Sequence, residues 1–191
     1  LGNAMNVFVL SKCPDEAAKM MCDKHIPKMI VEAAQMLSTA HRMLDGNLEV
    51  YINANGRKAR RYNLSDWRQQ VLYKAVHYHH PCTVWTMESS DNYQWHWKHL
   101  EALCAEYRFR YGKIHKTETT ILEALRTMPK NIPIGEMTKF RLAMQSNPEC
   151  MNEEDIIGSY RSFYQTKQTR FKMRWTDRPV PNWFTYQENA K

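Results

Sequence analysis

The sequence predicts a mainly α-helical protein, a compact single-domain helical bundle that carries one short basic β-hairpin. Apolar residues recur at helical spacing in several long segments. Asn55-Gly56 stands between two short β-prone runs, a pattern typical of a hairpin turn. The 191 residues hold only 6 Gly, with no internal repeat and no linker-like stretch. We therefore expect residues 5–191 to fold as one domain.

The N-terminal quarter is expected to hold an extended segment and two helices. Residues 1–4 precede the first Met and are interpreted as a cloning remnant outside the fold. The apolar run MNVFVL that follows suggests a short strand or an extended arm. Pro14, followed by two acidic residues, favours a helix over about 14–23. Pro27 fits the first turn of a second helix over about 26–43.

The next segment is expected to change from helix to hairpin and back. Val50, Tyr51 and Ile52 favour a strand, and the second arm, after the Asn-Gly turn, is basic. Ser65 is a plausible cap for a helix that reaches about residue 80. Pro81 is expected to end or interrupt that helix.

The second half is expected to be helical until its tail. A long helix over roughly 89–111 should stop at Gly112. Shorter helices are expected over about 118–127 and 136–145, with a loop between them. A further long helix should begin with Asn152 as its cap, because acidic residues fill its first turn. The remaining tail, rich in Pro and aromatic residues, is expected to be extended.

Charge points to an anionic partner. The chain has 27 Lys and Arg against 20 Asp and Glu, a net charge of +7. Double-stranded DNA is the partner we expect first and an acidic membrane surface second, with solubility as the plain alternative. No apolar run is long enough to span a bilayer and no signal peptide is visible, so we expect no membrane association.

The 5 Cys are widely spaced and form no C-x-x-C pair. This usage is typical of reduced thiols in a cytoplasm rather than of a disulfide framework. We expect a cytoplasmic monomer that needs no cofactor and no metal.

One line of polar residues crosses an otherwise amphipathic helix. His25, Lys28 and Glu32 share a face if the helix is continuous, and Glu32 flanks the apolar face in either case. A carboxyl group at such an edge can have a raised pKa and act as an acid or a base. The alternative is a Lys28–Glu32 ion pair on a wet surface, which stabilises by only a few tenths of a kcal/mol.

A histidine-rich stretch raises a second possibility. His77, His79 and His80 precede Cys82, and with Cys22 and His25 they could supply a zinc site. The two groups lie far apart in the sequence, so the pattern alone does not bring them together.

Candidate DNA contacts are basic or aromatic side chains in three segments: Arg57, Lys58, Arg60 and Arg61 in the hairpin, Lys113 and Lys116 after the long helix, and Arg178, Trp183 and Phe184 in the tail. Basic groups beside a turn can hold phosphates, and exposed aromatic rings can stack on bases. The alternatives are a solvated charged face, a complement to the helix dipole and a tail that packs back on the bundle.

The order of these features resembles a known family. An MNVFVL start, an Asp-x-His followed seven residues later by Glu32, an ANGRKARRY turn, His80 before a long helix, and a final helix running into an RP…WF…Y tail occur in sequence. This series resembles the phage-type pyrimidine-dimer DNA glycosylases of the endonuclease V type. Those enzymes are small, basic, mostly helical proteins of base excision repair. The resemblance touches most of the chain, apart from extra segments near 114–150.

The resemblance implies roles for particular residues. Glu32 matches the family's acid–base glutamate, which handles the sugar. The family's nucleophile is the α-amine of the residue after the start Met, which is Asn6 here, or Met5 if that Met is retained. Family arginines beside the glutamate are replaced here by Val31 and Gln35, so phosphate binding would fall to Lys28. His25 and His80 would orient water or phosphate.

The leading hypothesis is therefore a DNA glycosylase or lyase that acts on damaged or modified bases, with pyrimidine dimers as the substrate that the resemblance implies. If the protein is phage-encoded, it would act in the infected host cell. The alternatives are a non-catalytic DNA-binding phage accessory protein and a zinc-dependent hydrolase that uses the Cys and His residues.

Overall fold

The computed structural model describes residues 5–191, and the four residues interpreted as a cloning remnant lie outside this range. Most of the regular structure is helical, which confirms the predicted mainly α class. The described elements, in chain order, are α1 Pro14–Met20, α2 His25–Asp45, β1 Asn47–Ile52, β2 Lys58–Asn63, α3 Arg68–Val71, α4 Pro81–Glu88, α5 Ser90–Tyr111, α6 Lys116–Thr120, α7 Leu122–Leu125, the 3-10 helix η1 Pro148–Cys150, α8 Ile156–Gln165 and the 3-10 helix η2 Thr166–Thr169.

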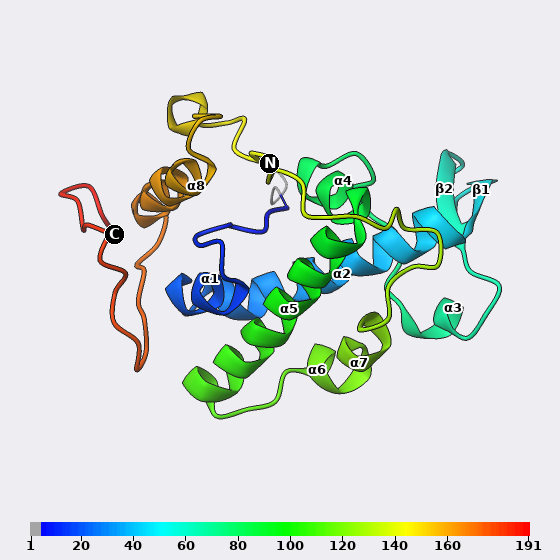
Figure 1. Ribbon diagram of the computed structural model, residues 1–191, viewed down its shortest axis with the longest axis horizontal. Coiled ribbons are helices and arrows are strands. Elements are labelled where there is room, and N and C mark those ends of the chain that lie inside the picture. Colours follow the sequence, from blue (N-terminus) through cyan, green and yellow to red (C-terminus); the bar gives the residue numbers. More distant parts are fainter. Residues whose placement is uncertain (1–4) are drawn as a thin grey trace.

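Two long helices form the centre of the molecule. Figure 1 shows α2 and α5 crossing there, with α1 and α4 beside them. Pro27 lies in the first turn of α2, as predicted, where the missing N–H costs no helical hydrogen bond. The α5 helix ends at Gly112, whose φ of 65° is the left-handed conformation that favours glycine. Both helices were predicted close to their observed bounds because their start and stop signals are clear.

The N-terminal segment is a buried extended arm, the second of the two forms predicted for it. Met5 to Leu10 are all buried. The Oδ1 atom of Asn6 accepts hydrogen bonds from the N–H groups of Val7 and Phe8, and its Nδ2 donates to the carbonyl of Ala143. The arm therefore packs inside the molecule, against segments from the far end of the chain.

The predicted hairpin is confirmed. β1 and β2 pair antiparallel from Asn47↔Asn63 to Ile52↔Lys58. The Asn53 side chain accepts from the N–H groups of Asn55 and Arg57, and Gly56 has φ 74°. Figure 1 shows the hairpin at the edge of the molecule, beyond the end of α2.

The prediction of a helix from Ser65 to about residue 80 is wrong. Only the four-residue α3 forms there, and Ser65 does not cap it. The reason lies in Arg42 on α2, whose buried guanidinium donates hydrogen bonds to nearby carbonyl groups. These carbonyls, which a continuous helix would use internally, belong to Gln69, Leu72 and Tyr73.

Pro81 begins a helix instead of ending one. It is the first residue of α4, where proline fits without cost, and the His80 side chain caps that helix by accepting from the Cys82 N–H at 3.1 Å. The HYHH run before it is therefore a connecting segment.

Three further predictions for the second half need correction. The helix expected over 118–127 is split into α6 and α7 at Ile121. The helix expected over 136–145 is extended chain, because its Thr138 backbone bonds to the Asn92 and Trp85 side chains. The last long helix is α8 with η2, and its cap is Asp155 rather than Asn152.

The extended tail packs back on the helices. The indole of Trp175 donates to the carbonyl of Met20 at 2.9 Å and lies edge-on to the ring of Phe184. Arg178 pairs with the buried carboxylate of Glu106. This observation favours the packed alternative for the tail over a free aromatic arm.

Candidate functional site

The line of polar residues on α2 is divided between core and surface. His25 is the first residue of α2, and only 5% of it is exposed. Glu32 lies two turns further along with 8% exposed, whereas Lys28 is exposed between them. The Oε2 atom of Glu32 has no hydrogen-bond partner among the described residues. A wet Lys28–Glu32 stripe, the plain alternative from the sequence, does not fit this burial.

Glu32 has the electrostatics of an acid–base group. Burial raises the pKa of its carboxyl from 4.5 to about 7, and the positive charge of Lys28 opposes this shift only in part. The group therefore exchanges its proton near neutral pH. A carboxyl with this property can take up or release a proton during a reaction at neutral pH.

His25 is held neutral by its surroundings. Its Nδ1 atom lies 2.7 Å from the Tyr164 hydroxyl, and its ring stacks on Phe8 with centroids 5.1 Å apart. Burial, followed by the charges of Lys28, Lys167 and Lys24, lowers the pKa of His25 to about 3. A neutral imidazole in this place can orient a partner but cannot serve as a cationic acid at neutral pH.

Basic side chains gather around the start of α2 without acidic partners. The Lys167 Nζ lies 4.3 Å from the centroid of the Phe163 ring, and the Lys24 Nζ lies 4.6 Å from that of Phe171. Burial, then Arg170, then Lys28 lower the pKa of Lys167 to about 8. We name Lys24, Lys28, Lys167 and Arg170 the α2 cation cluster. None of them joins an ion pair among residues 5–191, so the cluster is suited to an anion such as phosphate.

The sequence revealed only part of this cluster. Lys28 was named in advance because it shares a helix with Glu32. Lys167 and Arg170 come from η2 and the residue after it, some 140 positions later, and no local pattern links them to α2. Tyr164, which holds His25, was missed for the same reason.

Asn6 and His80 both lie at the buried arm, but with different amounts of freedom. The Asn6 side chain makes three hydrogen bonds to the backbone. The His80 ring caps α4 and bonds to the backbone of Met5; burial, followed by the charge of His77, lowers its pKa overall. Cys82 lies close enough to Glu32 for that carboxylate to add to the burial that raises the thiol pKa to about 12. The start of α4 thus lies near the arm through His80, and Cys82 lies near enough to Glu32 to feel its charge.

The hairpin cations separate into two groups. Arg57, Lys58 and Arg60 are exposed and join no ion pair in the described part of the chain. Arg61, in contrast, makes two hydrogen bonds of 2.8 Å to Glu49. Lys113 and Lys116 are exposed after α5, at a distance along the chain from both groups. The first three and these two lysines are free to contact phosphates.

The tail residues are less available than the sequence suggested. Phe184 is 6% exposed and buried against Trp175, so neither face of its ring is free to stack on a base. Trp183 is half-buried, with the Arg161 guanidinium 5.4 Å from its ring centroid. Arg178 is tied to Glu106 at 2.6 Å.

The two halves of the possible zinc site do not meet. Cys22 and His25 share the hydroxyl of Tyr164, whereas Cys82 lies beside Tyr160. Within residues 5–191, no group of three or more His, Cys, Asp or Glu is placed to hold a metal ion. The zinc alternative therefore gains no support from the geometry.

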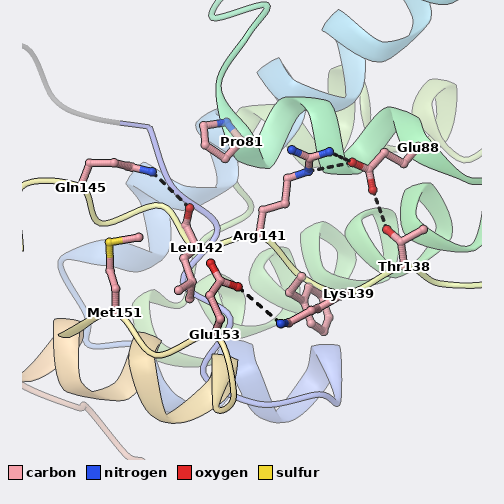
Figure 2. A pocket seen from close by; sticks show the side chains of 10 residues that line it. Pro81, Glu88, Thr138, Lys139, Arg141, Leu142, Gln145, Met151 and Glu153 are labelled. Atoms are coloured by element: carbon pink, nitrogen blue, oxygen red, sulfur yellow. Dashed lines mark hydrogen bonds and ion pairs between the residues drawn. The ribbon is translucent and has the colours of Figure 1, made fainter. Parts of the chain in front are cut away.

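Two surface hollows lie away from Glu32. Figure 2 shows one beside Pro81, where Glu88 pairs with Arg141 and bonds to Thr138, and Lys139 pairs with Glu153. These charges satisfy each other. The second hollow, of about 700 Å³, lies between the hairpin and residues 69–76 and is lined by Arg60, Tyr62 and Lys74 among others.

Comparisons with family models, curated proteins and solved structures find no match for this chain. In the described residues, none of the helices combines the length and the apolar character needed to cross a membrane.

Proposed function

We propose that this protein is a DNA glycosylase or lyase that acts on damaged or modified bases in double-stranded DNA, with Glu32 as its acid–base residue. The observation that carries the proposal is the buried Glu32 carboxyl, which has an unpartnered oxygen and a pKa of about 7. The α2 cation cluster beside it supplies the charge that a DNA backbone requires.

In this proposal each group has a chemical task. Loss of a base leaves positive charge on the sugar at C1′, which an ionised Glu32 stabilises. In strand cleavage by β-elimination, the ionised carboxyl takes up the proton lost from C2′ while the C3′–O bond breaks and the 3′-phosphate leaves. The α2 cation cluster holds the flanking phosphates, and neutral His25 orients a water or a phosphate oxygen. Pyrimidine dimers are the substrate that the family resemblance favours, with the N-terminal α-amine as nucleophile. The enzyme would act in the cytoplasm as a monomer.

The test is Glu32→Gln. We expect this variant to bind DNA like the unaltered protein and to lose cleavage of ultraviolet-irradiated plasmid by at least about 100-fold, because general acid–base groups contribute about that much or more. Borohydride added during the reaction would trap any imine. Glu123→Gln is the matched control, because that side chain is 83% exposed on α7. Cleavage that survives Glu32→Gln would refute the proposed chemistry.

A second candidate, a DNA-binding protein without catalysis, is favoured by one observation. The unpartnered oxygen of Glu32 is buried, so a substrate would reach it only after the surrounding arm or helices move. This candidate predicts tight, salt-sensitive binding with no turnover on irradiated or untreated plasmid. Reversing charge at Lys58 and Arg60 would then abolish its role, and Glu32→Gln would leave DNA binding unchanged.

A further inference from the structure

The two faces of the hairpin carry different chemistry. In the observed register Leu48 pairs with Tyr62, Val50 with Arg60 and Ile52 with Lys58, and cross-strand partners share a face. Glu49 with Arg61 and Tyr51 with Ala59 lie on the opposite face, because side chains alternate along a strand. We name the first set the aliphatic–basic face.

On the opposite face, the charged side chains pair with each other. Glu49 accepts two hydrogen bonds from Arg61 and a third, of 2.6 Å, from Asn63. The Arg61 guanidinium also lies 4.2 Å from the ring centroid of Tyr51. These side chains bind one another and leave little for a partner.

On the aliphatic–basic face, the apolar side chains are exposed and the cations have no acidic partner among residues 5–191. Leu48, Val50 and Ile52 are 50%, 56% and 63% exposed. Lys58 and Arg60 stand across from them and join no ion pair among residues 5–191. A row of exposed aliphatic groups beside a row of unpaired cations suits a partner that offers apolar groups between rows of anions.

The hairpin is also rigid at its base. The Arg42 guanidinium donates to the Tyr62 carbonyl at 2.9 Å, and the Tyr78 hydroxyl donates to the Arg60 carbonyl at 3.3 Å. The rings of Tyr62 and Tyr78 meet edge to face. The ribbon therefore projects from the end of α2 as a fixed arm (Figure 1).

We propose that the aliphatic–basic face lies in the major groove of double-stranded DNA. Lys58 and Arg60 would contact phosphates, and Val50 and Ile52 would press on base edges such as thymine methyl groups. The major groove, about 12 Å wide, admits a two-stranded ribbon in undeformed B-DNA, whereas the minor groove, about 6 Å wide, must first be widened by bending the DNA. This inference rests on the DNA binding of the proposed function, but not on its chemistry.

The experiment measures binding of the full chain to short duplex DNA by fluorescence anisotropy over a series of salt concentrations. Val50→Thr with Ile52→Thr keeps the β-branched shape and replaces one apolar branch of each side chain by a hydroxyl, so we expect about a 10-fold loss of affinity with an unchanged salt slope. Lys58→Gln with Arg60→Gln should lower that slope by about 2, since each lost phosphate contact removes about 0.9.

Two control variants set the comparison. Ile134→Thr changes an aliphatic side chain that is 82% exposed outside the hairpin, and it should bind like the unaltered protein. Glu49→Gln with Arg61→Gln alters only the self-neutralised face and should leave the salt slope unchanged. Methyl green, a major-groove ligand, should compete with the protein, and netropsin, a minor-groove ligand, should not.

Several outcomes would overturn the inference. These are full affinity in the Val50 and Ile52 variant, competition by netropsin alone, or no DNA binding by the unaltered protein. A dimer by sedimentation that the same variant converts to monomer would assign the face to a second copy of the chain instead. Because this experiment measures binding and not cleavage, it distinguishes a failure of this inference from a failure of the Glu32 chemistry.

Discussion

At the scale of single residues, the Glu32 carboxyl couples protonation to folding. Its pKa is about 7 in the folded protein and 4.5 ordinarily, so the folded state binds more protons between these values. Stability contributed by the neutral form is present below about pH 4.5 and is lost as the pH rises through about 7.

Glu32→Gln should remove this pH dependence. At pH 8 we expect the variant to be more stable than the unaltered protein by roughly 1–3 kcal/mol, because no charge is then buried. At pH 6, where the folded protein keeps most of this proton, the difference should be smaller. Urea unfolding at the two pH values measures both, and an equal difference at both would contradict the buried-charge explanation.

The Tyr164 hydroxyl is the second residue whose removal can be predicted. It accepts from the Cys22 N–H at 2.9 Å and bonds to the ring of His25. Tyr164→Phe leaves these buried groups without a partner and should cost about 1–3 kcal/mol. Tyr78→Phe, which removes an exposed hydroxyl bonded at 3.3 Å, should cost less than about 0.5 kcal/mol and serves as the control in thermal unfolding.

At the scale of elements, two glycines mark helix ends for different reasons. A Cβ at Gly112 would meet nothing within 4 Å, so only its left-handed φ of 65° matters. A Cβ at Gly46 would collide with the backbone carbonyl oxygen of Arg42 and lie 2.9 Å from that of Asn63.

Alanine at the two positions should therefore differ in effect. Gly112→Ala is expected to cost about 1 kcal/mol from backbone strain alone. Gly46→Ala should cost more than about 2 kcal/mol, because the junction of α2 with β1 must shift. Denaturant unfolding of both variants measures this order, and a reversed order would show that the junction yields easily.

The elements also show which parts of the fold a sequence pattern can reveal. The hairpin and the two long helices were predicted well because their signals, the Asn55-Gly56 turn and the Gly112 stop, are local. The helices expected after Ser65 and near 136–145 do not form, because Arg42 and Asn92 bind their backbone from elsewhere in the chain. Such distant competitors leave no trace in a local pattern.

The candidate site follows the same rule. The spacing placed Glu32 beside the apolar face and left a solvated stripe as the alternative, whereas the structure buries both Glu32 and His25. The spacing could not show that Tyr164, Lys167 and the Met5 arm complete the region, since these come from opposite ends of the chain.

At the scale of the whole molecule, four buried histidines make the fold sensitive to acid. Burial lowers the pKa to about 3 in two of them and to about 4 in the other two: His25 and His96, then His41 and His99. The unfolded chain takes up these protons from about pH 6.5 downward, whereas the folded chain resists until pH 3–4.

Stability should therefore fall steeply in mild acid. The unfolded state binds up to four extra histidine protons and the folded state one extra proton on Glu32, so the slope approaches about 4 kcal/mol per pH unit between roughly pH 6 and pH 4. We expect cooperative loss of helical circular dichroism in this range. Full helix content at pH 4, with unchanged urea stability, would contradict the neutral state of these histidines.

The buried arm has a consequence for how the chain is made. Asn6 bonds to Ala143, and the Leu10 carbonyl accepts from Arg161, 151 positions later. At roughly 5–20 residues per second, the arm is synthesised some 7–30 s before its partners exist. During synthesis its apolar side chains lack these partners, so we expect the nascent chain to bind chaperones. Burial of the arm must await the synthesis of Ala143 and Arg161.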